Sequence, residues 1–114
     1  MTLKVIAVII VAAALIFVLI QRVGKVSGSE ARRLVENGAL LLDVRTSQEF
    51  AAGHIPNAVN IPVQELDRRM GELGPKDRPV VIYCRSGRRS SHAATMLKKA
   101  GYTAVHDLGA MTRW

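Results

Sequence analysis

Residues 79–101 read PVVIYCRSGRRSSHAATMLKKAG and predict a strand, a loop and a helix in that order. Residues 79–83 form a continuous apolar run, which is typical of a strand buried on both faces of a parallel sheet. Residues 90–100 are predicted to form a helix, and Gly101 suits its end. The connecting loop, residues 84–89, therefore lies between a buried strand and a helix N-terminus.

The same alternation continues on the N-terminal side. Ser27 and Glu30 form a capping-box pattern that opens a helix through Asn37, with Gly38 after it. Residues 39–44, ALLLDV, predict a second buried strand. The remaining predicted elements are a short helix over 46–52, a turn over 53–57, a strand over 58–61, an amphipathic helix over 64–73, a loop over 74–77 and a strand over 103–106. Strands alternating with helices in this way predict an α/β fold with a small parallel β-sheet flanked by helices.

An apolar N-terminal stretch precedes this pattern. Residues 5–20 are all apolar, which is just below the roughly 17–25 residues of a spanning helix. Leu3 lengthens the stretch, and Lys4 can reach the lipid headgroups. The sequence predicts three parts, which are a transmembrane anchor over 1–22 with residues 3–22 in the membrane, a linker over 23–26 and one domain over 27–114. A cleaved signal peptide and a buried helix are the alternatives, but no small-x-small cleavage site follows the apolar run.

Lysine and arginine counts predict the orientation of this anchor. Lys4 and the terminal amine precede it, whereas Arg22, Lys25, Arg32 and Arg33 follow it. The excess after the span favours a single-pass membrane protein with a cytoplasmic domain. A single cysteine agrees with a reducing compartment, because it can form no internal disulfide.

Charge and histidine spacing argue against two classes of function, nucleic-acid binding and metal binding. Its formal net charge is +7, but three of its arginines lie beside Cys84, and no basic stripe is interleaved with aromatic residues. Nucleic acid is therefore not an expected partner. His54, His92 and His106 lack the spacing of metal ligands, so neither a metal nor another cofactor is expected.

Cys84 is the candidate nucleophile. It follows a buried strand at the point where open α/β sheets bind ligands, and it precedes a helix N-terminus whose N–H groups attract anions. The cations of Arg85, Arg88 and Arg89 favour a reactive thiolate. Gly87 permits the positive φ that a tight cradle needs. The alternative, an inert buried cysteine, fits poorly because an apolar environment would repel three charges. The loop therefore predicts a thiolate that attacks an anion.

Three stretches resemble the single-domain rhodanese-like sulfurtransferases. Residues 84–90, CRSGRRS, are similar to the active-site loop of that family, and Asp43-Val44-Arg45 is similar to its D-V-R. Residues 49–62, EFAAGHIPNAVNIP, resemble its E-F-x-x-G-H-I-P motif and the residues that follow. Ala110 stands where the family usually has a second glycine, and Asn57 stands in place of another. The resemblance covers residues 27–114.

This resemblance implies sulfur transfer by double displacement. Cys84 would take the outer sulfur of thiosulfate or a similar anion as a persulfide, and cyanide, a small thiol or a protein thiol would then accept it. Asp43, Arg45 and His54 are expected to be structural residues near the site. Arg85 and Arg88 are the best candidates for binding the donor, whereas Arg89 could instead pair with an acid. The implied substrate-binding set is Arg85, Ser86, Gly87, Arg88, Arg89 and Ser90.

Two other functions compete with this interpretation. Cysteine phosphatases use Cys-x₅-Arg, but the sixth residue after Cys84 is Ser90, which cannot supply the bidentate grip of an arginine. The second alternative is a membrane-tethered persulfide relay or partner-binding module without free-standing turnover. An intact nucleophile does not separate that relay from an enzyme.

Overall fold

The computed structural model describes the backbone of residues 2–23 and 25–114, and the side-chain environment of residues 2–16 and 25–114. Its helices are α1 (Leu3–Val23), α2 (Gly28–Glu36), α3 (Ser47–Ala51), α4 (Leu66–Arg69) and α5 (Arg88–Lys99). Its strands are β1 (Leu40–Asp43), β2 (Val59–Asn60), β3 (Val80–Cys84) and β4 (Val105–Ala110). Short 3₁₀ helices cover Val63–Glu65, Met70–Leu73 and Met111–Arg113.

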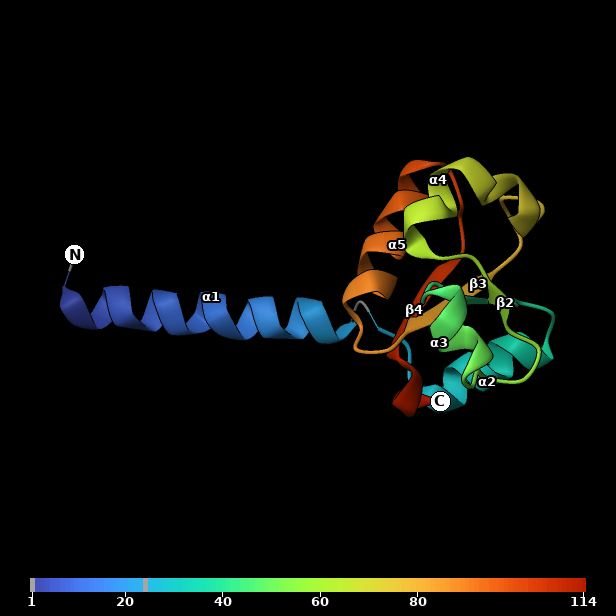
Figure 1. Ribbon diagram of the computed structural model, residues 1–114. Coiled ribbons are helices and arrows are strands. Elements are labelled where there is room, and N and C mark those ends of the chain that lie inside the picture. Colours follow the sequence, from blue (N-terminus) through green and yellow to red (C-terminus); the bar gives the residue numbers. More distant parts are fainter. Residues whose placement is uncertain (1, 24) are drawn as a thin grey trace.

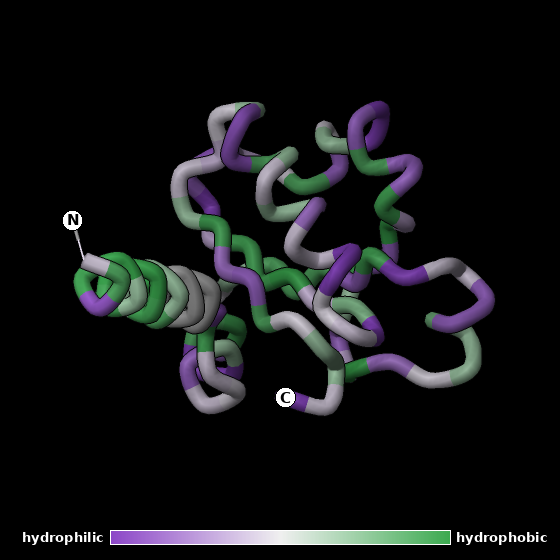
Figure 2. The backbone as a smooth tube through the Cα atoms, turned by 90° about the vertical axis from the view of Figure 1, so that its left-hand side faces the viewer, coloured by the Kyte–Doolittle hydropathy of each residue, from purple (hydrophilic) through white to green (hydrophobic). Residues whose placement is uncertain are grey.

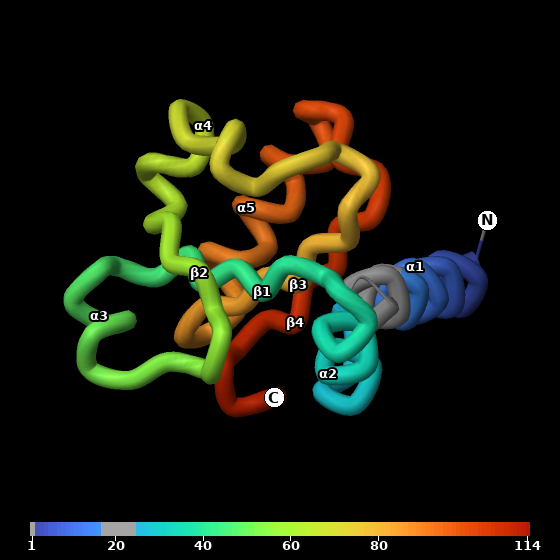
Figure 3. The backbone as a smooth tube through the Cα atoms, turned by 90° about the vertical axis from the view of Figure 1, so that its right-hand side faces the viewer, coloured from blue at the N-terminus to red at the C-terminus, as the bar shows by residue number. Residues whose placement is uncertain are grey.

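The strands form one parallel sheet in the order β2-β1-β3-β4. Helices α4 and α5 cover one face of this sheet, and α2 covers the other, as Figures 1 and 3 show from two sides. The predicted α/β fold with a small parallel sheet flanked by helices is therefore confirmed. β3 lies in the interior of the sheet, so its carboxyl end has a neighbouring strand on either side.

Each face of the sheet has its own apolar core, because successive side chains of a strand point to opposite faces. Leu42, Val80 and Ile82 pack with Leu97 on the α5 side. Leu41, Val81 and Tyr83 pack on the α2 side. Figure 2 shows these strands as hydrophobic segments in the middle of the molecule. Both faces are buried, which explains why the strands are continuous apolar runs in the sequence.

Some predicted boundaries differ from the structure. The helix predicted over 64–73 is wrong in its continuity, because this segment is α4 with a 3₁₀ turn on each side. Leu66 and Leu73 are nevertheless both buried, so the segment meets the same core requirement with a different backbone. β2 is a two-residue strand, shorter than the predicted 58–61, and β4 continues four residues beyond the predicted 103–106.

The predicted transmembrane anchor is not supported. Part of it lies outside the described residues, namely Met1 and the side chains of residues 17–22. In the described part of the chain no helix is long and apolar enough to cross a membrane.

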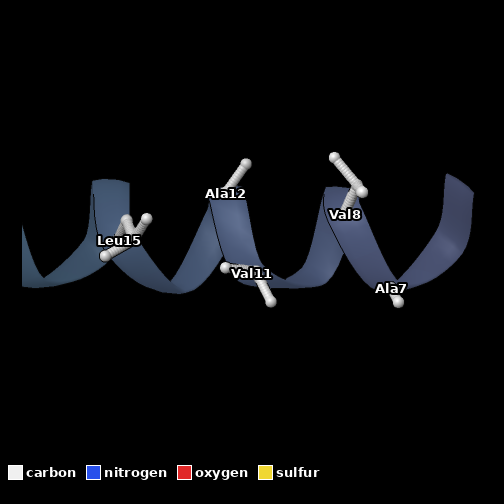
Figure 4. A pocket seen from close by; sticks show the side chains of 5 residues that line it. All are labelled: Ala7, Val8, Val11, Ala12 and Leu15. Atoms are coloured by element: carbon white, nitrogen blue, oxygen red, sulfur yellow. The ribbon is translucent and has the colours of Figure 1, made fainter. Parts of the chain in front are cut away.

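The described side chains of α1 are exposed. Large apolar residues such as Leu3, Val8 and Ile10 are 85%, 68% and 63% exposed. A shallow apolar depression of about 410 Å³ follows one side of this helix (Figure 4), lined by Ala7, Val8, Val11, Ala12 and Leu15. It is formed by α1 alone and contains none of the residues predicted to act on a substrate.

The chain returns to the sheet immediately before α2. Gly24 of the predicted linker lies outside the described residues, but Lys25 forms a parallel bridge with Asp107 of β4. The Val26 N–H donates to the Asp107 carbonyl at 2.9 Å. A Cβ at Gly28 would collide with the Arg113 carbonyl oxygen, so this position requires glycine. The two ends of the domain are therefore joined beside β4.

Candidate active site

Cys84 is the last residue of β3, not the first residue of the loop as predicted. It pairs with Ala110 at the carboxyl end of the sheet, and its side chain is fully buried. α5 begins at Arg88, two residues earlier than predicted. Only residues 85–87 separate the strand from the helix, so the sulfur lies directly below the helix N-terminus.

The cysteine sulfur has two polar neighbours. The backbone N–H of Gly87 donates to Cys84 Sγ at 2.9 Å. The Cys84 thiol donates to Ser90 Oγ at 3.4 Å, and the Ser90 hydroxyl donates to the Gly87 carbonyl at 3.1 Å. Gly87 has φ +101°, which a side chain would strain, and this conformation turns its N–H toward the sulfur. The loop is thus a cradle built around one sulfur atom.

α5 differs from α2 and α3 at its N-terminus. Ser27 caps α2, and Thr46 caps α3, each through its side-chain oxygen. In the described structure α5 has no side-chain cap, and its N-cap residue is Gly87. The first N–H groups of a helix have no intrahelical partner, and the helix dipole adds partial positive charge there. This end of α5 can therefore donate to an anion.

The three arginines of the loop have different environments. Arg85 and Arg88 are exposed, and the ion pairs of the described residues do not include them. Arg89 is held by Glu49 of α3 through two hydrogen bonds of 2.6 and 3.0 Å. Because the guanidinium of Arg89 is bonded to the Glu49 carboxylate, Arg89 fixes the position of the loop relative to α3. Arg85 and Arg88 remain the cations that can meet a substrate.

Glu49 has two partners that stabilise its charged form. The Arg89 guanidinium, first, and the Thr46 backbone N–H, second, lower the pKa of Glu49 to about 2. Thr46 and Glu49 also complete the capping box of α3, since each side chain accepts from the backbone N–H of the other. One carboxylate thus joins the start of α3 to the start of α5.

We expect the Glu49→Gln variant to lose stability in a pH-dependent way. The pKa of Glu49 is depressed on folding, so its contribution is complete above the unfolded value near ~4.3 and is lost as pH falls toward about 2. At pH 7 the partly exposed pair should contribute about 1 kcal/mol to the free energy of unfolding. Urea unfolding at pH 7, 4 and 2.5 measures this difference.

The difference between wild type and Glu49→Gln should be largest at pH 7 and shrink at pH 2.5. Glu36, an exposed glutamate of α2, provides the matched control as Glu36→Gln. An equal loss at all three pH values would contradict the role of the Glu49 charge.

Asp43 and Arg45 form a buried pair on the rim of the sheet. Asp43 Oδ2 accepts from Arg45 Nη2 at 2.7 Å, and their side chains are 0% and 8% exposed. Arg45 Nη2 also donates to the Gly53 carbonyl at 2.7 Å. The guanidinium lies 5.6 Å from the ring centroid of Tyr83, the residue before the nucleophile. The pair therefore ties β1 and the turn after α3 to β3.

Tyr83 is buried beneath this pair. Its hydroxyl oxygen accepts from the Ile55 N–H at 3.2 Å. Burial, first, and the Asp43 carboxylate, second, raise the pKa of Tyr83 to about 12. Tyr83 therefore stays protonated at physiological pH and serves as a structural partner of the rim.

His54 lies on the exposed turn after α3. Its ring stacks on Phe50 with 3.7 Å between centroids, and its Nδ1 is 2.9 Å from the Phe50 carbonyl oxygen. These contacts fit the structural role predicted for this residue. They hold the turn that carries Gly53 toward Arg45.

Two charged residues near the loop were not assigned a role from the sequence. Glu49 stands in the motif that resembles the sulfurtransferase family, and its place three residues after Thr46 is the signal of a capping box. Its bond to Arg89, 40 residues away, has no local signal. Lys25 reaches the loop from outside the predicted domain, as described below.

Known proteins are similar to this chain in sequence and in fold. A family model for the rhodanese-like domain matches residues 27–114. A sulfurtransferase of Allochromatium vinosum is 46% identical over 90 residues, which cover 77% of this chain and 83% of the relative. Human thiosulfate:glutathione sulfurtransferase is 35% identical over 105 residues, covering 78% and 90%. The solved structure of a human single-domain sulfurtransferase is 33% identical with a TM-score of 0.69, covering 80% of this chain and 94% of that one.

Proposed function

Because the chain belongs to the rhodanese-like domain family, we propose that it moves sulfane sulfur from thiosulfate, or a similar anion, through a Cys84 persulfide to a thiophilic acceptor. The sulfurtransferase relatives support sulfur transfer in general. The observation that carries the proposal is the 2.9 Å hydrogen bond from Gly87 N–H to Cys84 Sγ. This backbone N–H can stabilise a negative charge on the sulfur of Cys84, the only cysteine of the sequence.

In the first half-reaction the Cys84 thiolate attacks the outer sulfur of thiosulfate. A sulfur–sulfur bond forms at Cys84, the bond within thiosulfate breaks, and sulfite leaves with the electron pair. The product is a cysteine persulfide whose terminal sulfur carries the negative charge. Uncapped N–H groups at the start of α5 would stabilise that charge, as oriented donors do for a developing anion.

The donor meets exposed cations before it meets the sulfur. Cys84 is fully buried, whereas Arg85, Ser86 and Arg88 are exposed on the loop above it. Arg85 and Arg88 are the groups we assign to the sulfonate oxygens of the donor, since guanidinium groups match such oxyanions. The loop must open for the thiolate to reach the outer sulfur. Ser90 could then donate its hydroxyl to the thiolate.

In the second half-reaction an external acceptor attacks the terminal sulfur of the persulfide. A small thiolate gives a new persulfide, and cyanide gives thiocyanate, with Cys84 released as a thiolate in either case. The sequence contains no second cysteine, so no internal thiol can resolve the intermediate. A protein thiol is an equally suitable acceptor, which keeps the persulfide relay as the alternative to free-standing turnover.

We expect thiosulfate to add one sulfur atom to Cys84 in the full-length chain. Mass spectrometry of the intact protein, followed by peptide mapping, measures that addition. A second incubation with cyanide should remove the sulfur and release thiocyanate in equal amount. Prior alkylation of Cys84 serves as the control, since it blocks the nucleophile.

The two candidate functions differ in this experiment. Turnover with thiosulfate and cyanide supports a free-standing sulfurtransferase. A persulfide that forms only from a persulfidated protein, and not from thiosulfate, supports the relay. Addition of the sulfur anywhere but Cys84 would refute both.

A further inference from the structure

Lys25 brings a further cation to the active-site loop from outside the residues that match the family. It precedes residue 27, where the family match begins, and lies 82 residues from its partner Asp107. Its Nζ is 2.9 Å from Asp107 Oδ2. The Asp107 side chain is only 8% exposed, so its carboxylate lies in the protein interior. The pair fixes the lysine beside the carboxyl end of β4.

Two glycines lie close to this side chain. A Cβ at Gly109 would lie 3.3 Å from Lys25 Cδ and 3.5 Å from Nζ, and Gly109 has φ +87°. A Cβ at Gly87 would lie 3.7 Å from Lys25 Nζ. Because the Gly87 N–H bonds to Cys84 Sγ at 2.9 Å, covalent geometry places the ammonium within about 10 Å of the sulfur. Lys25 therefore lies close to the same glycine that holds the nucleophile.

The ammonium of Lys25 also has donor capacity beyond its ion pair. A lysine has three N–H donors. Asp107 Oδ2 takes one, while Asp107 Oδ1 accepts from the Gly109 N–H at 2.9 Å. The Lys25 side chain is 31% exposed, so water or a dissolved anion can reach it. Arg89 gives two of its donors to Glu49, and its side chain is 29% exposed.

The sheet order places these two charged pairs on either side of β3. Glu49 belongs to α3, which follows β1, and Asp107 belongs to β4. β1 and β4 are the two neighbours of β3. The loop after β3 thus has an ion-paired, partly exposed cation on each side, Arg89 toward β1 and Lys25 toward β4. The Lys25 ammonium is the one that lies close to Gly87.

We propose that Lys25 is a further anion-binding residue of this site, whose ammonium holds the negatively charged end of the sulfur donor beside Gly87. The inference rests on the proposed sulfur transfer for the identity of the donor, but not for the binding of an anion. A protein trimmed to the family boundary would lack this group. Lys25 is not a catalytic residue, because it makes no bond to the transferred sulfur.

The test compares Lys25→Met with wild type in the full-length chain. Methionine keeps an unbranched stem against Gly109 and removes the charge. We expect kcat/KM for thiosulfate, which reports the donor half-reaction, to fall about 5- to 10-fold, the effect of one charge-assisted hydrogen bond. Lys25→Arg should restore most of it. Lys98→Met, at an exposed position of α5, removes the same net charge and should leave kcat/KM unchanged.

A second readout does not depend on turnover. Sulfate should protect Cys84 from iodoacetamide, and half-protection of Lys25→Met should require about 5- to 10-fold more sulfate than wild type. One outcome is that wild type makes no thiocyanate while Lys25→Met still requires more sulfate than wild type for half-protection. In that case the inference stands and the proposed function fails. Equal protection of Lys25→Met and wild type would overturn the inference.

The double variant Lys25→Met/Asp107→Asn separates anion binding from a structural ion pair. Asparagine can still accept from the Gly109 N–H, and neither charge is left unpaired. Continued weak sulfate protection in the double variant supports a direct role of the ammonium. Wild-type protection and kcat/KM in the double variant would show that only the ion pair matters, and would overturn the inference.

Discussion

The Cys84→Ser variant should lose sulfur transfer from thiosulfate by on the order of 10³-fold or more in kcat/KM. Serine fills nearly the same buried space and can keep the hydrogen bond from Gly87 N–H, so the cradle is preserved. A serine hydroxyl is a far weaker nucleophile at neutral pH than a thiolate, and it forms no persulfide. Thiocyanate production from thiosulfate and cyanide measures the loss.

The matched control for this variant is Ser91→Ala. Ser91 is an exposed residue of α5 just beyond the loop and is not a partner of the sulfur in the structure. Its activity should stay within a few-fold of wild type. Full activity of Cys84→Ser, with the far-ultraviolet circular dichroism of a folded chain, would refute the persulfide mechanism.

The Asp43→Asn variant should lower the free energy of unfolding by about 3 kcal/mol. Removing the negative charge leaves the Arg45 guanidinium in a site where its side chain is only 8% exposed. The shape of the residue is retained, so the loss reports the uncompensated charge. Urea unfolding followed by circular dichroism measures it, with catalysis unaffected in the fraction that stays folded.

Two variants test the reason for that loss. Asp67→Asn, at an exposed position, should change the free energy of unfolding by less than about 0.5 kcal/mol. Asp43→Asn/Arg45→Met removes both charges and should recover part of the stability. If the double variant loses as much stability as Asp43→Asn and the single variant Arg45→Met lose together, the two charges do not interact.

The central strands were predictable because their environment is uniform. β1 and β3 are buried on both faces, so every residue is apolar until the last position of β1, and the predicted boundaries are within about one residue of the observed ones. The capping residue Ser27 was also readable, because a cap is a local hydrogen bond. These signals together fix the α/β class.

The segment from 63 to 73 shows where such patterns are ambiguous. Leu66, Met70 and Leu73 recur at three- and four-residue intervals, which satisfy an α-helix and a chain of 3₁₀ turns equally well over so short a stretch. The pattern identified the buried side chains and not the backbone between them.

The nucleophile and its cradle were predictable because they are consecutive in the chain. Cys84, Gly87 and Ser90 lie within seven residues, and a strand followed by a helix places them together. Glu49 pairs with Arg89, 40 residues away, and Lys25 pairs with Asp107, 82 residues away. The sequence next to Glu49 and Lys25 gives no sign of these pairs. Tertiary contacts of single charged side chains leave no period in a sequence.

Residues 25–26 can pair with β4 only after β4 has been synthesised. At about 5–20 residues per second, the 82 residues between Lys25 and Asp107 take several seconds to emerge from the ribosome. Until then β3 lacks one neighbour and the flank of Cys84 formed by Ala110 does not exist. The nascent thiol therefore gains the cover of Ala110 only when the last strand has been made.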